Sequence, residues 1–222
     1  QPDISLLYSS AGADGLVGVG WSLAQSYFQR RTKDGLNYGA DAYIFVENGN
    51  AQDLVFVGDA GTLGYEYRLE EEDGRDLRIF RRRFNPVGMY EWYWVVLTKE
   101  GIEWTFGSAY APNIWPPGVI GVPPFSAFRW QLTRVEDSNG NYMTYQSAGG
   151  DEKKIGLIRY AGNSISGLQP TNEVEFLYGA RPLPYRTFEA RGYAGILHDN
   201  LLEQIVVRAG GALVARYVLG YG

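Results

Sequence analysis

The sequence has 222 residues, with 29 glycines, 17 tyrosines, 10 phenylalanines, 6 tryptophans and no cysteine. The absence of cysteine excludes disulfides, zinc thiolates and thiol nucleophiles. A net charge of −5 argues against nucleic-acid binding, which requires a clustered basic face. No apolar run approaches the ~18 residues of a membrane helix, and no signal peptide is present. This composition favours many short strands joined by frequent turns.

The opening stretch, residues 2–31, has the most distinctive pattern of the chain. Ile4, Leu6 and Tyr8 alternate with Ser5 and Leu7, as in a strand, and a glycine-rich segment follows. Glycines at this spacing allow backbones to approach closely or to adopt positive φ. The pattern predicts a strand, a tight glycine turn and a second strand, with the Trp21 ring lying across a glycine surface.

Three hairpins are predicted between residues 43 and 106. The first joins residues 43–46 to 54–57 through Glu47-Asn48-Gly49-Asn50, which we expect to form a loop longer than two residues. The second joins residues 65–71 to 77–84 at Asp73-Gly74. We expect the basic cluster Arg81-Arg82-Arg83 to lie opposite Glu70-Glu71-Glu72 in this hairpin.

The third hairpin joins residues 90–98 to residues 102–106. Its first strand has apolar side chains on both faces, which predicts a central strand or one that is covered on each side. The aromatic residues Tyr90, Trp92 and Trp94 could stack on a carbohydrate, but alternating aromatics more often fill a packed sheet face. We therefore favour a core role for these three.

A proline-rich arm is predicted at residues 111–125, because five prolines and two glycines there prevent a helix or a ladder strand. Within it, Ile114 and Trp115 have no evident strand to cover them. They could contact a partner or neighbouring domain, or they could fold back on the module's own sheet. They are the candidate partner-contact residues.

Further strands are predicted at residues 128–135, 142–146, 155–160, 173–178, 201–208 and 213–219. The fold class is therefore all-β: about a dozen antiparallel strands in long hairpins, forming an open-edged sheet or sandwich-like module. We expect one domain over residues 1–222.

Residues suited to catalysis or metal binding are few. The sequence has one histidine, His198, and no G-x-S-x-G motif that would provide a serine nucleophile for it. His198 is therefore interpreted as a surface or hydrogen-bonded residue. Asp137, Asn139 and Asn141 imitate a calcium loop, but Ala148 stands where a bidentate glutamate is needed, so they are interpreted as a turn. The glycine-rich segment before Trp21 does not contain the lysine that a phosphate-binding loop requires. No catalytic, cofactor-binding or metal-binding residue is predicted.

Five motifs in order carry a resemblance that covers nearly the whole chain. They are the opening Pro2-Asp3-Ile4-Ser5-Leu6 with Tyr8-Ser9-Ser10, then Gly18-Val19-Gly20-Trp21-Ser22-Leu23 with Arg30, then Thr98-Lys99-Glu100-Gly101 with Phe106-Gly107, then Trp130-Gln131-Leu132 through Asp137, Gly140-Asn141 and Tyr145, and finally the late residues Arg181-Pro182 and Tyr221. In this order they resemble the SpvB-type domain, found in a Salmonella virulence protein and in the B components of insecticidal toxin complexes, and related to Rhs and YD-repeat shell proteins.

The resemblance implies a non-enzymatic structural module of a bacterial toxin-complex or Rhs-type protein, secreted or extracellular. Such a module would form part of a β shell that encapsulates a toxic passenger. Its partners would be the remaining domains of its own parent chain and other toxin-complex subunits, with no nucleic acid, membrane span or cofactor. The resemblance also implies that the sequence is a piece of a longer chain. The ADP-ribosyltransferase of the virulence protein occupies a separate domain, and the Rhs autoprotease motif has only a partial counterpart at residues 85–88.

Two alternatives remain open at this point. The chain could be a free-standing extracellular module that binds glycans or a cell surface, since aromatic residues are abundant and the proline-rich arm could expose an apolar tip. It could also be a hydrolase that uses a pair of carboxylates, although no particular pair stands out.

Overall fold

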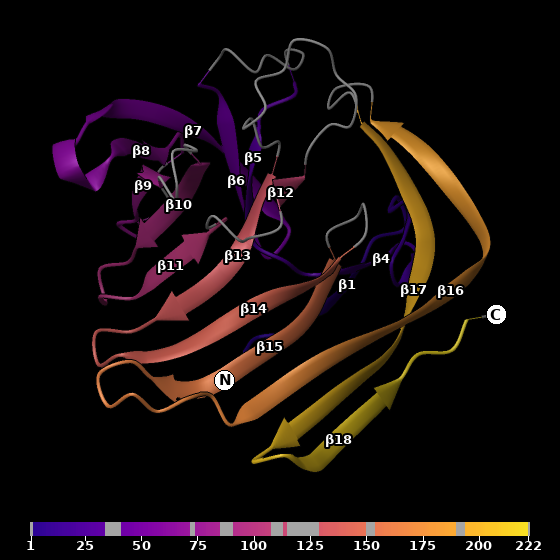
Figure 1. Cartoon of the computed structure of the whole chain (residues 1–222). Helices are drawn as coiled ribbons and strands as arrows, with labels where there is room; N and C mark the ends of the chain where they lie inside the picture. Colours follow the sequence, from indigo (N-terminus) through magenta and orange to yellow (C-terminus); the bar gives the residue numbers. More distant parts are fainter. Residues whose placement is uncertain are drawn as a thin grey trace. The chain divides into compact units, whose positions relative to one another are not determined.

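The computed structural model describes residues 2–33, 41–71, 74–84, 91–107, 113–114, 129–149, 154–189 and 194–221 (Figure 1). The described residues form strands and one short 3₁₀ helix, η1(Gly61–Leu63), which is far too short to cross a membrane; no longer apolar helix is found among them. The predicted all-β class is confirmed. The strands are β1(Leu6–Tyr8), β2(Asp14–Gly15), β3(Gly18–Val19), β4(Trp21–Leu23), β5(Tyr27–Arg30), β6(Tyr43–Glu47), β7(Asn50–Asp59), β8(Tyr65–Leu69), β9(Arg78–Phe84), β10(Glu91–Leu97), β11(Glu103–Phe106), β12(Asn113–Ile114), β13(Arg129–Glu136), β14(Asn141–Gly149), β15(Lys154–Asn163), β16(Asn172–Glu189), β17(Ala194–Ala209) and β18(Ala212–Val218).

The chain divides into two compact units. Unit 1 comprises residues 1–24, 139–188 and 195–222, and unit 2 comprises residues 25–138 and 189–194. Unit 2 is thus almost continuous in sequence, whereas unit 1 is assembled from three segments. The single domain predicted for residues 1–222 stays a prediction.

Unit 2 is a closed antiparallel barrel. Strands β5 to β11 follow one another as a meander, each paired with the next. Strand β13 then closes the sheet, because it pairs with β11 on one side and with β5 on the other. The sequence predicted the hairpins but not this closure, which depends on pairing between strands far apart in the chain. A closed barrel of this kind leaves no free edge among its eight paired strands.

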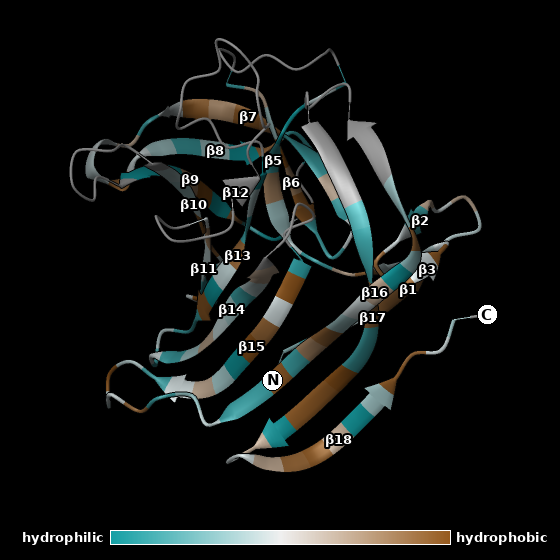
Figure 2. Cartoon of the chain, turned by 45° about the vertical axis from the view of Figure 1, so that its right-hand side comes forward, coloured by the Kyte–Doolittle hydropathy of each residue, from teal (hydrophilic) through white to brown (hydrophobic). Residues whose placement is uncertain are grey.

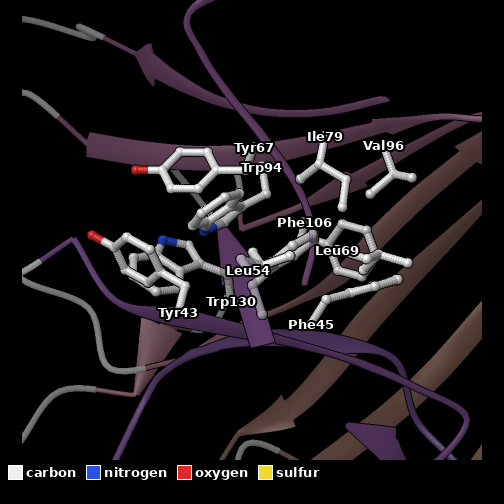
Figure 3. Packing of buried hydrophobic residues seen from close by; sticks show 11 residues of the cluster. Tyr43, Phe45, Leu54, Tyr67, Leu69, Ile79, Trp94, Val96, Phe106 and Trp130 are labelled. Carbon is white, nitrogen blue, oxygen red and sulfur yellow. The ribbon is translucent and has the colours of Figure 1, made fainter. Parts of the chain in front are cut away.

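Large aromatic side chains fill the barrel interior. Alternate residues of each strand face inward, so paired positions such as Phe28 and Phe45 meet on the same side. Trp94 lies at the centre, fully buried, with its ring stacked on Phe28 at a centroid distance of 4.4 Å (Figure 3). Trp130 is also buried, and its Nε1–H donates to the Trp92 carbonyl at 2.8 Å. The core role predicted for Trp94 is confirmed.

The opposite face of β10 is covered as well, as its sequence predicted. Val95 is buried on this face, and its register partner in β9, Phe80, is also buried. Of the other two aromatics assigned to the core, Trp92 is half-buried, whereas Tyr90 lies outside the described residues.

The first predicted hairpin is tighter than expected. Glu47 pairs with Asn50, so Asn48 and Gly49 alone form the turn, with φ of 47° and 89°. Two successive residues with positive φ match a type I′ turn, whose twist suits a two-residue hairpin. The expectation of a longer loop was wrong, because β6 and β7 extend through polar residues that the hydrophobic pattern does not include.

The predicted pairing of the arginine cluster with the glutamates was also wrong. The β8–β9 register places Arg81 opposite Tyr65, several residues away from Glu70 and Glu71. Glu70 and Glu71 lie close to the turn, and residues close to a turn pair with residues just beyond it. Arg81 lies further along β9 and therefore pairs further back along β8. Arg81 forms an ion pair with Asp41 instead, and Arg82 donates to the Leu63 carbonyl.

Unit 1 contains an antiparallel sheet that runs in the order β14, β15, β16, β17 and β18. Its core is a cluster of buried aliphatic and aromatic side chains, namely Val17, Ile158, Val174, Phe176, Leu202 and Ile205. Strands β16 and β17 have 18 and 16 residues, three times the usual strand length, and form a long ribbon (Figure 1). Strand β18 ends the sheet, paired with β17 on one side.

The N-terminal segment packs on this sheet as two small hairpin-like pairs. Strand β1 pairs with β4, and β2 pairs with β3. The Leu16 carbonyl accepts a hydrogen bond from the backbone N–H of Leu202 in β17 at 2.7 Å, and Val17 is buried in the core of unit 1. The predicted strand, turn and strand are therefore present.

The sequence predicted the Trp21 ring over the glycines, but a different aromatic ring lies over Gly20. Tyr8, rather than Trp21, lies against Gly20, where an added Cβ would come within 2.9 Å of the tyrosine ring. Trp21 instead packs against Tyr8 with ring centroids 5.1 Å apart. The Tyr221 ring covers Gly18. These glycines thus allow aromatic rings from two other segments to approach the backbone.

Candidate functional site

A groove of about 800 Å³ lies in unit 1, between the N-terminal strands and residues of β16, β17 and the segment after β18. Five large apolar side chains that line it are exposed to solvent: Leu6, Val19, Trp21, Leu183 and Tyr221. Leu183 is 83% exposed and Val19 is 71% exposed, although both are large hydrophobic residues. An exposed apolar surface that lines a groove is typical of an interaction site.

Arg181 anchors the wall of this groove. The residue is buried, and its Nη1 donates to Asp14 Oδ2 at 2.8 Å while its Nη2 donates to the Gly15 carbonyl at 2.6 Å. These contacts tie β16 to β2, the first short strand of the glycine-rich segment. Tyr185, four residues further along the same strand, donates from its hydroxyl to the Asp14 carbonyl at 2.6 Å. Asp14 is thus held by two side chains of β16.

His198 lies close to this cluster. Its ring stacks on Tyr185 with centroids 4.6 Å apart and an interplanar angle of 11°. The side chain is half-buried. The ring therefore supports the position of Tyr185, whereas the sequence predicted a surface or hydrogen-bonded position for His198.

The calcium-like residues take part in a turn. Asn163 donates from Nδ2 to the Asn139 carbonyl at 2.9 Å and to Asn141 Oδ1 at 3.0 Å, and its own Oδ1 accepts from the Ser166 backbone N–H. The Asn139 carbonyl and the Asn141 side-chain oxygen thus accept hydrogen bonds from Asn163. In the described part of the chain, no group of three or more acidic, histidine or cysteine residues is arranged to hold a metal ion.

A second cluster of polar groups lies inside the barrel of unit 2. The Arg81 guanidinium lies 4.3 Å from the Trp92 ring centroid and 4.8 Å from that of Tyr43. Its Nη1 donates to Asp41 Oδ1 at 2.9 Å. The guanidinium of the buried Arg30 lies 5.4 Å from the centroid of the same Tyr43 ring. Cation–π contacts of this kind help to offset the cost of burying two arginines.

Burial governs the ionisation of the tyrosines in this cluster. Desolvation raises the pKa of Tyr43 and of Tyr67 above the ordinary tyrosine value, and the nearby Arg81 charge opposes that rise in both cases. The two hydroxyls lie on the same side of the aromatic cluster (Figure 3). Both tyrosines therefore stay neutral at physiological pH and act as packing groups rather than as bases.

The candidate contact residues of the proline-rich arm are only partly within the described residues. Ile114 belongs to β12, and its backbone lies opposite Arg129 in β13. Its side chain and the whole of Trp115 lie outside the described residues. Their role in partner contact stays a prediction.

Sequence reasoning missed the groove of unit 1. Leu183 is separated from Val19 by more than 160 residues, so no local pattern brings them together. Arg181 and Tyr221 were noted only through the family resemblance. A usable signal existed in Leu183, an isolated apolar residue between two prolines, which do not favour a central strand.

Comparisons with solved structures give the same fold for the whole chain. The N-terminal domain of effector protein SpvB from Salmonella typhimurium strain LT2 aligns with a TM-score of 0.77 and 19% identity, over 100% of this chain and 89% of that chain. The Tc holotoxin pore of Photorhabdus luminescens aligns with a TM-score of 0.79 and 17% identity, over 99% of this chain. The TcdB2-TccC3 structure aligns with a TM-score of 0.75 and 17% identity, also over 99% of this chain.

The chain spans most of the SpvB N-terminal domain but only 13% and 14% of the two toxin chains. Among curated proteins no match was found. The family described as Salmonella virulence plasmid 65kDa B protein, SpvB, matches residues 1–165, which is well over half of the sequence. The chain therefore belongs to the SpvB family.

Proposed function

We propose that this chain is a non-catalytic structural module of a secreted bacterial toxin-complex protein, and that it forms part of a β shell around a toxic passenger. The observation that carries the proposal is the free edge of β18. Within the described residues this strand pairs only with β17, so the backbone groups along its other side have no strand partner. Unpaired edges of this kind invite pairing with a further strand.

The side chains of β18 support the same interpretation. Tyr217 lies opposite Ile205 of β17 and shares its face. Leu213 and Val218, opposite Arg208 and Gln204, share the other face, and Val214 lies in a β-bulge. All four side chains are exposed. Hydrophobic residues mark the strand in Figure 2. A strand that is apolar on both faces is typical of the interior of a covered sheet. Extension of the unit 1 sheet beyond β18 would bury these side chains and build the wall outward.

The long ribbon of β16 and β17 suits a wall rather than a small enzyme. At about 3.3 Å per residue, 18 residues of β16 span roughly 60 Å. The likeness to the Tc holotoxin pore and the TcdB2-TccC3 structure supports assembly with further domains and subunits of a toxin complex. Encapsulation of a passenger is the role that this proposal assigns to such a wall.

Hydrogen exchange measured by mass spectrometry tests the proposal. The 222-residue chain would be compared with the complete gene product that contains it. We expect β18 amides to exchange rapidly in the 222-residue chain and to be protected in the complete product, while β17 amides are protected in both. Full protection of β18 in a monomeric 222-residue chain would remove the basis for a shell wall.

A further inference from the structure

The groove of unit 1 has an apolar rim that the fold of the unit does not need. Val19 of β3 and Leu183 of β16 both line the groove, and both are largely exposed. The core of unit 1 consists of other residues, such as Phe176 and Leu202. The rim side chains therefore gain little from the folding of this unit, and their exposure costs solubility unless something covers them.

The inner surface of the groove carries no net charge. Its one cation, Arg181, is paired with its one anion, Asp14, at 2.8 Å. The remaining lining is mostly aliphatic or aromatic and includes Val17, Leu201 and Leu219. A charged occupant would lose its hydration without gaining an unpaired partner, so the groove favours an uncharged one.

Strand edges border the groove. Leu6 belongs to β1 and Val19 to β3, and each of these strands pairs on one side only, within the described residues. An edge offers backbone N–H and C=O groups to an added strand, while alternate side chains of that strand enter apolar pockets. The volume of about 800 Å³ lies in the ~300–1,000 Å³ range of specific binding sites.

We propose that this groove binds an extended, uncharged, apolar segment of a partner polypeptide, with Val19 and Leu183 as its main contacts. Arg181 and Asp14 hold the two walls together and leave the groove neutral. The inference requires unit 1 alone and goes beyond the shell role, because it assigns a peptide-binding surface that is separate from the edge of β18.

Fluorescence anisotropy with a defined probe tests this inference. The probe is a fluorescein-labelled heptapeptide of alternating valine and threonine with blocked ends, titrated with the full 222-residue chain. We expect saturable binding, and we expect Leu183→Glu and Val19→Glu each to raise the Kd about tenfold or more, since each variant places a charge in the apolar site. Both side chains are exposed, so neither variant should unfold the protein.

Ile165→Glu is the matched control, because Ile165 is 76% exposed but does not line the groove. It should leave the Kd within about twofold of the parent value. A second peptide, with glutamate in place of valine, should not bind. Equal weakening by Leu183→Glu, Val19→Glu and Ile165→Glu would overturn the proposal. So would loss of binding only in a further variant, Leu213→Glu, which alters β18 and not the groove. Self-association of the chain that Leu183→Glu abolishes would also overturn it.

Discussion

Trp94 is the residue on which the barrel core depends most. Its side chain is fully buried and contacts Phe28, Tyr43, Tyr67 and Trp130. Trp94→Ala should lower the free energy of unfolding by about 3–5 kcal/mol, because it removes a large buried ring and leaves a cavity. Urea denaturation followed by far-UV circular dichroism measures the change. Val57→Ala, at an exposed position of β7, should change stability by less than about 0.5 kcal/mol.

The two members of the Arg81–Asp41 ion pair should differ in their contributions to stability. The Arg81 side chain is 7% exposed, whereas that of Asp41 is 67% exposed. Asp41→Asn should therefore cost less than about 1 kcal/mol, as for other exposed carboxylates. Arg81→Ala should cost more, because it also removes packing between Trp92 and Tyr43. Equal losses in urea denaturation of the two variants would contradict this account.

Alkaline pH should destabilise the protein through its buried tyrosines. Burial raises the pKa of Tyr145 to about 12, with a smaller contribution from the Asp3 charge. The unfolded-state pKa is near 10, so the contribution of Tyr145 is complete below pH 10 and is lost as the pH rises toward 12.

Tyr145→Phe tests this effect, because it removes the titrating hydroxyl and keeps the ring. Between pH 9 and pH 11 the variant should lose up to about 1.4 kcal/mol less stability than the parent. Urea denaturation at each pH gives the two slopes. Parallel curves for parent and variant would show that Tyr145 is not responsible.

The β6–β7 hairpin depends on a turn that only certain residues can form. Gly49 has a φ of 89°, in a region that L side chains rarely adopt. Gly49→Ala should lower the free energy of unfolding by about 1–2 kcal/mol. Gly58→Ala, in the adjoining strand β7, is the control, since nothing lies within 4 Å of the added Cβ and the φ of Gly58 is not positive. A larger loss for Gly58→Ala in thermal denaturation would contradict the turn assignment.

The sequence predicted local elements well and distant pairings poorly. The hairpin at residues 65–84 and the β10–β11 pair were found because turn residues and alternating apolar residues lie close together in the chain. Closure of the barrel by β13 was not predicted, since β5 and β13 are about a hundred residues apart in the sequence. Any strand with a suitable apolar pattern could pair with the edge of β5. The groove of unit 1 was missed for the same reason.

The family resemblance supplied what periodicity did not. Arg30, Trp130 and Tyr221 were noted as matching positions without a structural role. In the structure Arg30 lies over Tyr43 and 6.0 Å from the Trp130 ring, and Tyr221 covers Gly18 and donates to the Leu202 carbonyl at 2.6 Å. These residues hold strands together across the fold, which a one-dimensional pattern cannot express.

At the scale of the whole molecule, unit 2 should fold without unit 1. Residues 25–138 contain all eight barrel strands, and the core cluster around Trp94 lies wholly within them. Most of its strands also pair with their neighbours in sequence, which favours rapid and independent folding. Unit 1, by contrast, draws on three separate segments and needs the chain on both sides of the barrel.

A fragment of residues 25–138 should therefore unfold cooperatively and keep the near-UV circular dichroism of its stacked Phe28 and Trp94 rings. A fragment of residues 25–128 is the control, because it lacks β13 and leaves β5 and β11 with open edges. It should lose the near-UV signal and associate in size-exclusion chromatography. If both fragments lose that signal, the barrel requires unit 1, and residues 1–222 fold as the single domain predicted from the sequence. If both keep it, pairing with β13 is not what holds the barrel together.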